Sequence, residues 1–307
     1  MNKNLIKICY QKLNNEIKGT WDELAILYDY KSGEALRSKF KKYRKERKEL
    51  NNVETRILCL SDLHYPYNIE LDFLHEYRHK TDILLINGDE QDCELLSKYD
   101  KTYRCGFDEE IIGCRQMLID IINSVKPKKV IFNHGNHNLR FINYFKKRIH
   151  ESLLIFFPET NLSFICDNGI RFHNHKSKDK TETFYKPLKE IFDIPIEYTK
   201  SFYCKIGKTI FAHPKACKQG ILGTAEKAYL YFKQNEEDFS SLVLAHTHQV
   251  GIYKYGKCLL YEQGSLCKEP SYSTDGSLMR LQGQGFIYIC QDSDGKLIYD
   301  KTKLVIL

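Results

Sequence analysis

The sequence has no apolar run near the roughly 20 residues that a helix needs to cross a bilayer. Residues 1–6 also lack the apolar segment and the small-residue cleavage site of a signal peptide. We therefore expect a protein without membrane attachment, located in the cytoplasm.

Closely spaced cysteines are also absent. The 11 cysteines are scattered, and the nearest pairs, Cys105/Cys114 and Cys258/Cys267, lie nine residues apart. Because structural zinc sites built on thiolates normally use Cys-x-x-Cys pairs, this spacing argues against such a site. We expect reduced thiols that are mostly buried and act as small apolar side chains.

Hydrophobic content and charge set the domain plan. The 307 residues are 42% hydrophobic and include 21 Tyr and 17 Phe, which is enough for a full core and a small extra domain. Residues 1–52 contain 13 Lys/Arg and 7 Asp/Glu, whereas the other 255 contain 34 and 33. The basic character therefore belongs to the first 52 residues, and we place a boundary between residues 52 and 53.

Residues 1–52 read as three helices. The first spans 4–14. The second starts at Thr20, which forms a capping-box pattern with Glu23, and it should bury Trp21, Leu24, Ala25 and Leu27. Ser32 can cap a third helix over 33–48, whose buried stripe is Leu36, Phe40 and Tyr43.

The third helix carries its Lys and Arg residues on the face opposite that stripe. Helix, turn and basic helix is the order that places a recognition helix in a DNA groove. We predict a helix-turn-helix-like module whose DNA contacts come from Arg37, Lys41, Lys42, Arg44 and Lys45. A protein-docking helix is the alternative.

Residues 53–307 alternate strands and helices before becoming rich in strands. We predict strands at 56–61, 83–87 and 129–133, helices at 69–80 and 108–124, and a mainly helical stretch after Asn136. Later strands are predicted at 202–206, 208–212, 241–245, 251–255, 258–262, 285–291 and 296–306. This order predicts an α/β domain with a two-sheet β-sandwich core flanked by helices. The polar residues 171–187 read as an insertion or a mobile loop over the site.

Five short polar motifs occur at the ends of these strands. They are Asp62-Leu63-His64, Gly88-Asp89-Glu90-Gln91-Asp92, Gly135-Asn136-His137-Asn138, Phe211-Ala212-His213 and Ala245-His246-Thr247-His248. Side chains at strand ends point into a common crevice, and residues two apart in an extended segment share a face. Carboxylates and imidazoles together suit manganese, iron or zinc ions.

The order of these motifs resembles the calcineurin-like metallophosphoesterase superfamily, whose pattern is D-x-H, G-D, G-N-H, H and G-H-x-H. The resemblance covers roughly residues 55–264, and Ala245 stands where the family usually has Gly. It implies two divalent ions, for which manganese is favoured over iron, zinc or nickel. The implied ligands are Asp62, His64, Asp89 and His248 for one ion, and Asp89, Asn136, His213 and His246 for the other.

The resemblance also implies roles beyond metal binding. His137 would protonate the leaving oxygen, and Asp92 would orient His137 or act as a helix cap. Arg140, near the start of the next helix, would contact a substrate phosphate. Six histidines match no motif and are read as structural or surface residues: His75, His79, His134, His150, His173 and His175.

The motifs do not choose the substrate. The arginines that grip phosphate in the protein phosphatases of this superfamily are missing, which argues against a phosphoprotein. The basic module favours DNA, so we predict a nuclease that resembles the DNA-repair branch. A phosphodiesterase for small esters such as cyclic nucleotides is the alternative, and a DNA-binding regulator with an idle metal fold is a third.

Overall fold

The computed structural model describes residues 3–13, 16–51, 54–97, 105–157, 160–173, 182–215, 218, 220, 222–235, 237–268 and 282–307. For Lys3 and residues 44–51 only the backbone is described. The chain divides into two compact units, Met1–Glu54 and Thr55–Leu307.

The first unit contains three helices, α1 (Lys3–Leu13), α2 (Trp21–Leu27) and α3 (Gly33–Asn51). The predicted caps are confirmed, because Thr20 and Glu23 form a capping box and the Ala35 N–H donates to Ser32 Oγ at 3.1 Å. Gly33 allows α2 and α3 to approach closely, since a Cβ there would lie 2.7 Å from the Asp22 backbone nitrogen.

The core of this unit lies between the three helices. It consists of Leu5, Cys9, Ala25, Leu36 and Phe40. The predicted stripe on α3 is therefore correct. The inward position predicted for Leu27 is wrong, because α2 ends at this residue and its side chain is 74% exposed.

The second unit contains two large sheets. The first has the order β13-β12-β1-β2-β3-β6, formed by Lys303–Ile306, Gly285–Gln291, Thr55–Leu60, Ile83–Asn87, Lys129–Asn133 and Ile196–Tyr198. The second has the order β10-β11-β9-β8-β7, formed by Val250–Tyr255, Cys258–Gln263, Ser241–Leu244, Thr209–Ala212 and Tyr203–Ile206. Strands β1, β2 and β3 are parallel to one another, as are β8 and β9.

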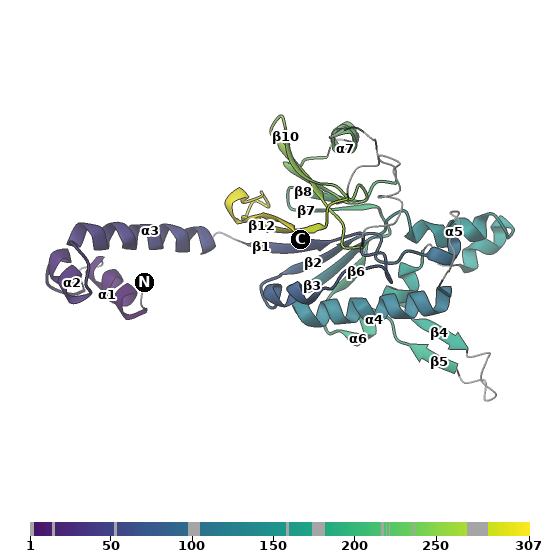
Figure 1. Cartoon of the computed structure of the whole chain (residues 1–307), viewed down its shortest axis with the longest axis horizontal. Coiled ribbons are helices and arrows are strands. Elements are labelled where there is room, and N and C mark those ends of the chain that lie inside the picture. Colours follow the sequence, from purple (N-terminus) through teal and green to yellow (C-terminus); the bar gives the residue numbers. More distant parts are fainter. Residues whose placement is uncertain are drawn as a thin grey trace. The chain divides into compact units, whose positions relative to one another are not determined.

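Alternating side chains on each sheet build the layers. One face of the first sheet packs on the second sheet through residues such as Ile57, Leu85, Phe211 and Val243. Its other face packs on α4 (Phe107–Val125), whereas α7 (Gly223–Gln234) covers the outer face of the second sheet (Figure 1). The predicted α/β class, with two packed sheets flanked by helices, is confirmed.

Shorter elements complete the unit. They are α5 (Asn138–Lys146), α6 (Leu188–Ile191), the 3₁₀ turns Asp72–Tyr77, Glu94–Leu96, Glu151–Phe156 and Tyr299–Lys301, and a π-helical turn at Phe164–Asn168. A hairpin of β4 (Ile170–His173) and β5 (Glu182–Tyr185) occupies part of the segment predicted as an insertion or mobile loop. Residues 174–181 of that segment, including His175, lie outside the described residues.

Two predicted elements are wrong in extent. The helix expected over 69–80 is only the 3₁₀ turn Asp72–Tyr77, because the preceding backbone pairs with residues 266–268. The Ile69 N–H donates to the Leu266 carbonyl at 3.0 Å and Asn68 forms a β-bridge with Cys267, so the backbone before Asp72 is paired with another segment. The strand expected over 296–306 is confined to β13, since Tyr299–Lys301 forms a turn.

Among the described residues, no helix is both long and apolar enough to span a membrane.

Candidate metal centre

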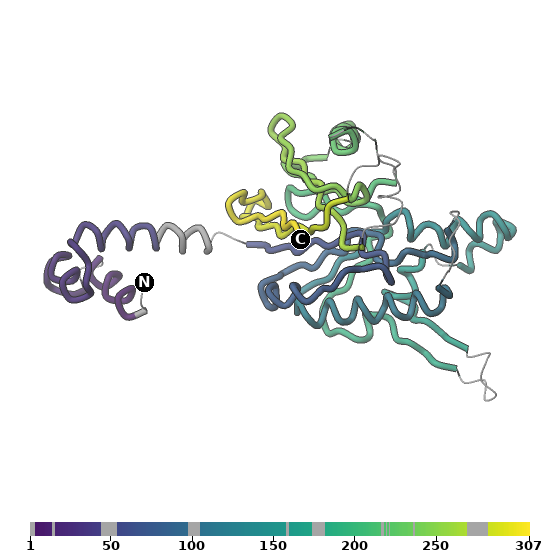
Figure 2. The backbone as a smooth tube through the Cα atoms, in the orientation of Figure 1, coloured from purple at the N-terminus to yellow at the C-terminus, as the bar shows by residue number. Residues whose placement is uncertain are grey.

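The five motifs meet at one edge of the two sheets. Strands β1, β2 and β3 run side by side and end at the same edge (Figure 2). Asp62, Asp89 and Asn136 follow these strand ends in the sequence. Strands β8 and β9 deliver His213 and His246 in the same way. Parallel pairing therefore converts separate sequence motifs into a single cluster.

The loops at this edge hold one another in place. The Asp62 N–H donates to the Gly88 carbonyl at 3.1 Å, and the His64 N–H donates to the Asp89 carbonyl at 2.9 Å. Both aspartates and three histidines of the cluster have left-handed backbone: Asp62, Asp89, His64, His246 and His248, with φ between 48° and 74°. Such residues each cost about 1–3 kcal/mol and concentrate at functional sites.

Gly135 makes room for the carboxylate of Asp89. A Cβ at this position would lie 2.1 Å from Asp89 Oδ1. That same oxygen accepts the backbone N–H of His137 at 2.8 Å. The Gly-Asn-His motif therefore needs its glycine because the backbone passes directly over the aspartate.

The first group of ligands surrounds Asp62. His248 Nε2 lies 3.1 Å from Asp62 Oδ1 and 3.3 Å from His64 Nε2. Oxygen or nitrogen atoms of Asp62, His64 and Asp89 all lie within 4.8 Å of one another. The structure thus brings together the four side chains predicted for one ion.

The second group surrounds Asp89 and shares it with the first. Asp89, His213 and His246 also offer atoms within 4.8 Å of one another. His213 Nε2 lies 3.1 Å from Asp89 Oδ2 and 3.2 Å from Asn136 Oδ1. Asp89 thus belongs to both groups, which is the position predicted for it.

The imidazoles are oriented by their second nitrogens. His213 Nδ1 donates to the Asn87 carbonyl at 2.8 Å, and His248 Nδ1 donates to Gln282 Oε1 at 2.8 Å. Protein ligands of metal ions normally have such outer partners, which aim the other nitrogen at the metal. Together with the buried carboxylates, these residues fit divalent metal ions, and the cluster can bind metal.

Charge in the cluster is tightly paired. Burial alone would raise the pKa of Asp62 and Asp89, but the imidazoles of His213 and His248 at Asp62, and of His213 and His137 at Asp89, hold both pKa values well below the usual range. Burial lowers the pKa of His64, yet the nearby carboxylates of Asp62 and Asp92 outweigh it and raise this pKa to about 10. Protons on the imidazoles therefore balance the carboxylates when metal is removed.

Metal uptake should displace these protons. For His213, burial is outweighed by the charges of Asp89 and Asp62, which raise its pKa to about 9. Burial lowers the pKa of His248, but the charge of Asp62 outweighs it and holds this pKa well above its usual value. A ligand nitrogen must lose its proton to bind metal, so at pH 8 we expect release of about three protons per chain, from His64, His213 and His248. Apparent metal affinity should then rise with pH until these imidazoles are neutral, above pH 10.

Titration calorimetry of chelator-treated protein with Mn(II), in two buffers of different ionisation enthalpy, measures the released protons. His213→Gln should reduce the number by about one, because one of the three protons is lost with the imidazole. Exposed His150, which contacts Ser152, supplies the control variant His150→Gln with an unchanged number. Release of no protons at pH 8 would contradict this electrostatic description.

His137 lies beside both groups but points its ring at other partners. Its Nδ1 lies 2.9 Å from the Asp92 carbonyl and 3.1 Å from Asp92 Oδ1. Asp92 thus lies against His137, its orienting role stays a prediction, and its Oδ1 also lies 3.4 Å from His64 Nδ1. One carboxylate therefore fixes a candidate ligand and a candidate acid.

Arg140 lies beside His137 and Asp92. Its guanidinium donates to the Asp92 carbonyl at 2.8 Å and to His137 Nε2 at 2.8 Å. These bonds hold the guanidinium at the N-terminus of α5, where His137 is the N-cap, and its contact with a substrate phosphate stays a prediction. Burial lowers the pKa of His137, and the positive charge of Arg140 acts in the same direction.

A buried polar network beneath the cluster was not predicted. Asn138 Oδ1 accepts the Gly135 N–H at 2.7 Å, and Asn138 Nδ2 donates to Glu90 Oε1 at 2.6 Å and to Asn161 Oδ1 at 3.0 Å. Asn161 in turn donates to Gln91 Oε1 at 2.7 Å. Because these groups are buried and mutually bonded, they hold the two metal-binding loops rigidly.

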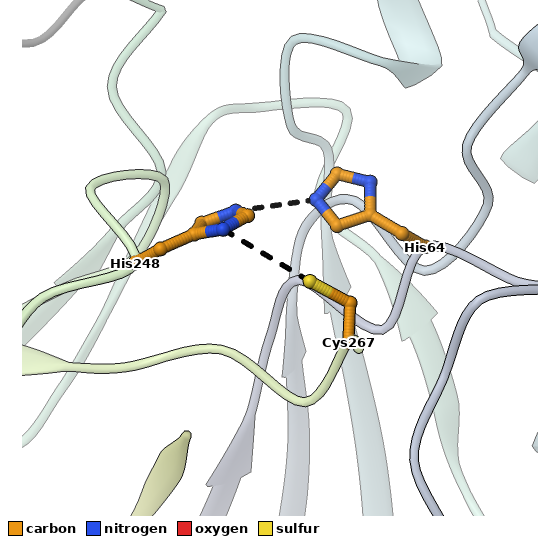
Figure 3. A group of neighbouring side chains, drawn as sticks. All are labelled: His64, His248 and Cys267. Carbon is orange, nitrogen blue, oxygen red and sulfur yellow. Dashed lines mark hydrogen bonds between the residues drawn. The ribbon is translucent and has the colours of Figure 1, made fainter. Parts of the chain in front are cut away.

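Cys267 is the second feature that sequence reasoning missed. Its Sγ lies 4.0 Å from His248 Nδ1, and Figure 3 shows it facing His248 and His64. The ten cysteines described are free thiols, most of them buried as predicted, but Cys267 is not remote from the chemistry. Its place after β11, at the edge that carries His248, is the only sequence signal that could have found it.

No protein-family model matches the chain, and no curated protein matches it. Solved structures that resemble it include Vps29 from Entamoeba histolytica complexed with Zn²⁺, at 14% identity and a TM-score of 0.37, covering 82% of this chain and 98% of that one. A novel archaeal phosphodiesterase has 12% identity and a TM-score of 0.36, covering 82% and 100%. A metallophosphoesterase from Sphaerobacter thermophilus has 12% identity and a TM-score of 0.32, covering 79% and 85%. All three resemblances lie below 25% identity and below a TM-score of 0.5, so they support no conclusion about function.

Proposed function

We propose that this chain is a two-metal phosphoesterase of the calcineurin-like kind, that it hydrolyses phosphodiester bonds, and that its substrate is DNA. The observation that carries the proposal is the position of Asp89 in two ligand groups that share one edge of the sheets. A carboxylate between two such groups is the arrangement of two-metal hydrolases, whose ions lie about 3.5–4 Å apart. Bound divalent ions would supply Lewis acidity toward a phosphate oxygen and lower the pKa of a water molecule.

The side chains of the cluster would bind the ions and protonate the leaving group. Asp62, His64, Asp89, Asn136, His213, His246 and His248 hold the ions. His137 is not one of these seven ligands. Its Nε2 lies 3.9 Å from Asp89 Oδ2, which would place it beside a phosphate bound at the ions. With a proton on Nε2 it donates to the leaving oxygen, once the Arg140 guanidinium turns from that nitrogen toward the developing negative charge.

Turnover of bis-p-nitrophenyl phosphate in Mn(II) tests the enzymatic part of the proposal. Loss of turnover with chelator and recovery with Mn(II) are expected. Substrate choice is tested by labelled single- and double-stranded DNA set against a cyclic nucleotide. Cleavage of the cyclic nucleotide alone would favour the small-ester alternative, and no cleavage of any ester would favour an idle metal fold.

The basic helix α3 supports a nucleic-acid substrate. The side chains of Lys41 and Lys42 are exposed on α3, on the side away from Leu36 and Phe40. Arg37 is also exposed, and its guanidinium lies 5.5 Å from the ring centroid of Trp21. The side chains of Arg44 and Lys45, which the sequence also assigns to DNA contact, lie outside the described residues. The helix-turn-helix interpretation and DNA contact by these residues stay predictions.

A salt titration tests the contribution of α3. Each phosphate neutralised contributes about 0.9 to the slope of log affinity against log salt, so the variant with Lys41→Ala and Lys42→Ala should lose up to about 1.8 of that slope. Fluorescence anisotropy with a labelled DNA duplex, at several salt concentrations, measures both affinity and slope. The full-length chain is used throughout.

Lys254 and Lys257 provide the matched control, because they are exposed residues in and beside β10 of the second unit. Replacing both with alanine removes the same charge, yet should leave the slope unchanged. Equal slopes in the wild type and the Lys41/Lys42 variant would remove the main support for DNA as the substrate. That result would instead favour α3 as a protein-docking helix.

A further inference from the structure

A cavity of about 380 Å³ opens beside the second ligand group. Its walls come from the loop before α5, the ends of β7 and β8, and one face of α7. Ligand cavities in proteins typically measure about 300–1,000 Å³, so the space suits a small organic group. None of the predicted sequence motifs accounts for it.

The cavity is continuous with the metal centre. Asn136 and His213, two of the proposed ligands, line it. A phosphate held by the ions would therefore place one of its ester groups at the mouth of the cavity. The occupant is thus part of the substrate and not a separate ligand.

Three Phe or Tyr side chains contribute to the walls. Phe202, Tyr231 and Phe232 all line the cavity, with ring centroids of Phe202 and Tyr231 6.2 Å apart and those of Tyr231 and Phe232 5.2 Å apart. Leu139 adds an apolar surface from α5. The planes of Phe202 and Tyr231 are inclined by 58° and those of Tyr231 and Phe232 by 81°, so a base would stack on one ring, for which the 48% exposed Tyr231 is available.

The charged residues of the lining have one sign. Lys215 and Lys227 belong to it, whereas its described residues include no Asp or Glu. A cavity with aromatic walls and ammonium groups fits an aromatic ring attached to an anion. An apolar protein segment would use the rings but not the lysines.

We propose that this cavity is a nucleobase subsite, which receives the base of the nucleotide whose phosphodiester lies at the metals. The inference rests on the proposed function and names its substrate class as nucleotide esters. It assigns specificity to Phe202, Tyr231 and Lys227, which lie outside the five motifs. The base is held by stacking, and the lysines attract phosphate.

Two esters with the same leaving group test this subsite. Thymidine 5′-(p-nitrophenyl phosphate) carries a nucleoside, whereas methyl p-nitrophenyl phosphate does not. We expect kcat/KM of the full-length Mn(II) protein to favour the thymidine ester by roughly 10-fold or more, chiefly through KM. Equal values for the two esters would overturn the proposal.

Tyr231→Ala should reduce that preference roughly 5- to 50-fold, because the exposed ring is lost from the cavity. Leu230→Ala is the matched control, since Leu230 precedes it on α7, is 45% exposed and does not line the cavity. The Leu230→Ala protein should prefer the thymidine ester over the methyl ester as strongly as the wild type does. An unchanged preference in Tyr231→Ala would contradict the assignment.

Calorimetry separates failure of the subsite from failure of the function. With Mn(II) bound, thymidine 5′-monophosphate should bind more tightly than inorganic phosphate. Tyr231→Ala should reduce the difference between these two affinities. If neither ester is hydrolysed but this difference is found, the subsite stands and the hydrolytic function fails. If turnover is found with no difference in binding or in kcat/KM, the function stands and the subsite fails.

Discussion

Replacing His137 with alanine is expected to lower phosphodiester turnover by about 10²–10⁴-fold while the metal content stays unchanged. The imidazole lies against Asp92 and Arg140, and its backbone N–H donates to Asp89 Oδ1, a bond that alanine keeps. The substitution therefore removes a proton donor without removing a ligand. Steady-state kinetics with bis-p-nitrophenyl phosphate and elemental analysis of the same sample measure both quantities.

His150→Ala is the matched control for this experiment. His150 is exposed and its ring contacts Ser152, so its loss should change neither turnover nor metal content. If His137→Ala instead lost metal and kept its turnover per bound ion, His137 would be a ligand. That outcome would overturn the role assigned to it.

Replacing Asp89 with asparagine is expected to weaken both metal sites together. Asn has nearly the shape of Asp and can still accept the His137 N–H, so the loops should keep their arrangement. The amide is neutral, however, and cannot balance two divalent ions as a shared carboxylate does. Elemental analysis after dialysis should show the loss of both ions.

His248→Ala and Asp238→Asn complete this comparison. His248 belongs to one group only, so its loss should chiefly affect one ion. Asp238 pairs with Lys208 at the surface, and its substitution should leave both ions bound. An Asp89→Asn protein that kept one ion as tightly as the wild type would show that Asp89 does not bridge.

The sequence predicted the site better than it predicted the surrounding structure. Residues such as Asp62 and His213 follow apolar strands directly, so local spacing and parallel pairing are enough to bring them together. Cys267 and Gln282 contact His248 of this cluster, although they lie 19 and 34 residues from it along the chain. No local pattern encodes such contacts.

The elements of the fold also differ in how well the sequence predicts them. Strands with continuous apolar runs, such as β1 and β2, were located within a residue, because burial on both faces leaves a clear signature. The three-residue strand β6 and helix α7 were missed, and the helix over 69–80 was overextended. In that last case the backbone around Asn68 is paired with Cys267, a contact that the local helical pattern does not encode.

Metal stoichiometry, measured together with turnover, tests the central claim most directly. The full-length chain is equilibrated with saturating Mn(II), dialysed, and divided between elemental analysis and an assay with bis-p-nitrophenyl phosphate. We predict two ions per chain and hydrolysis that disappears with chelator and returns with Mn(II). At most one ion per chain, or two ions without hydrolysis of any phosphoester, would contradict a two-metal phosphoesterase.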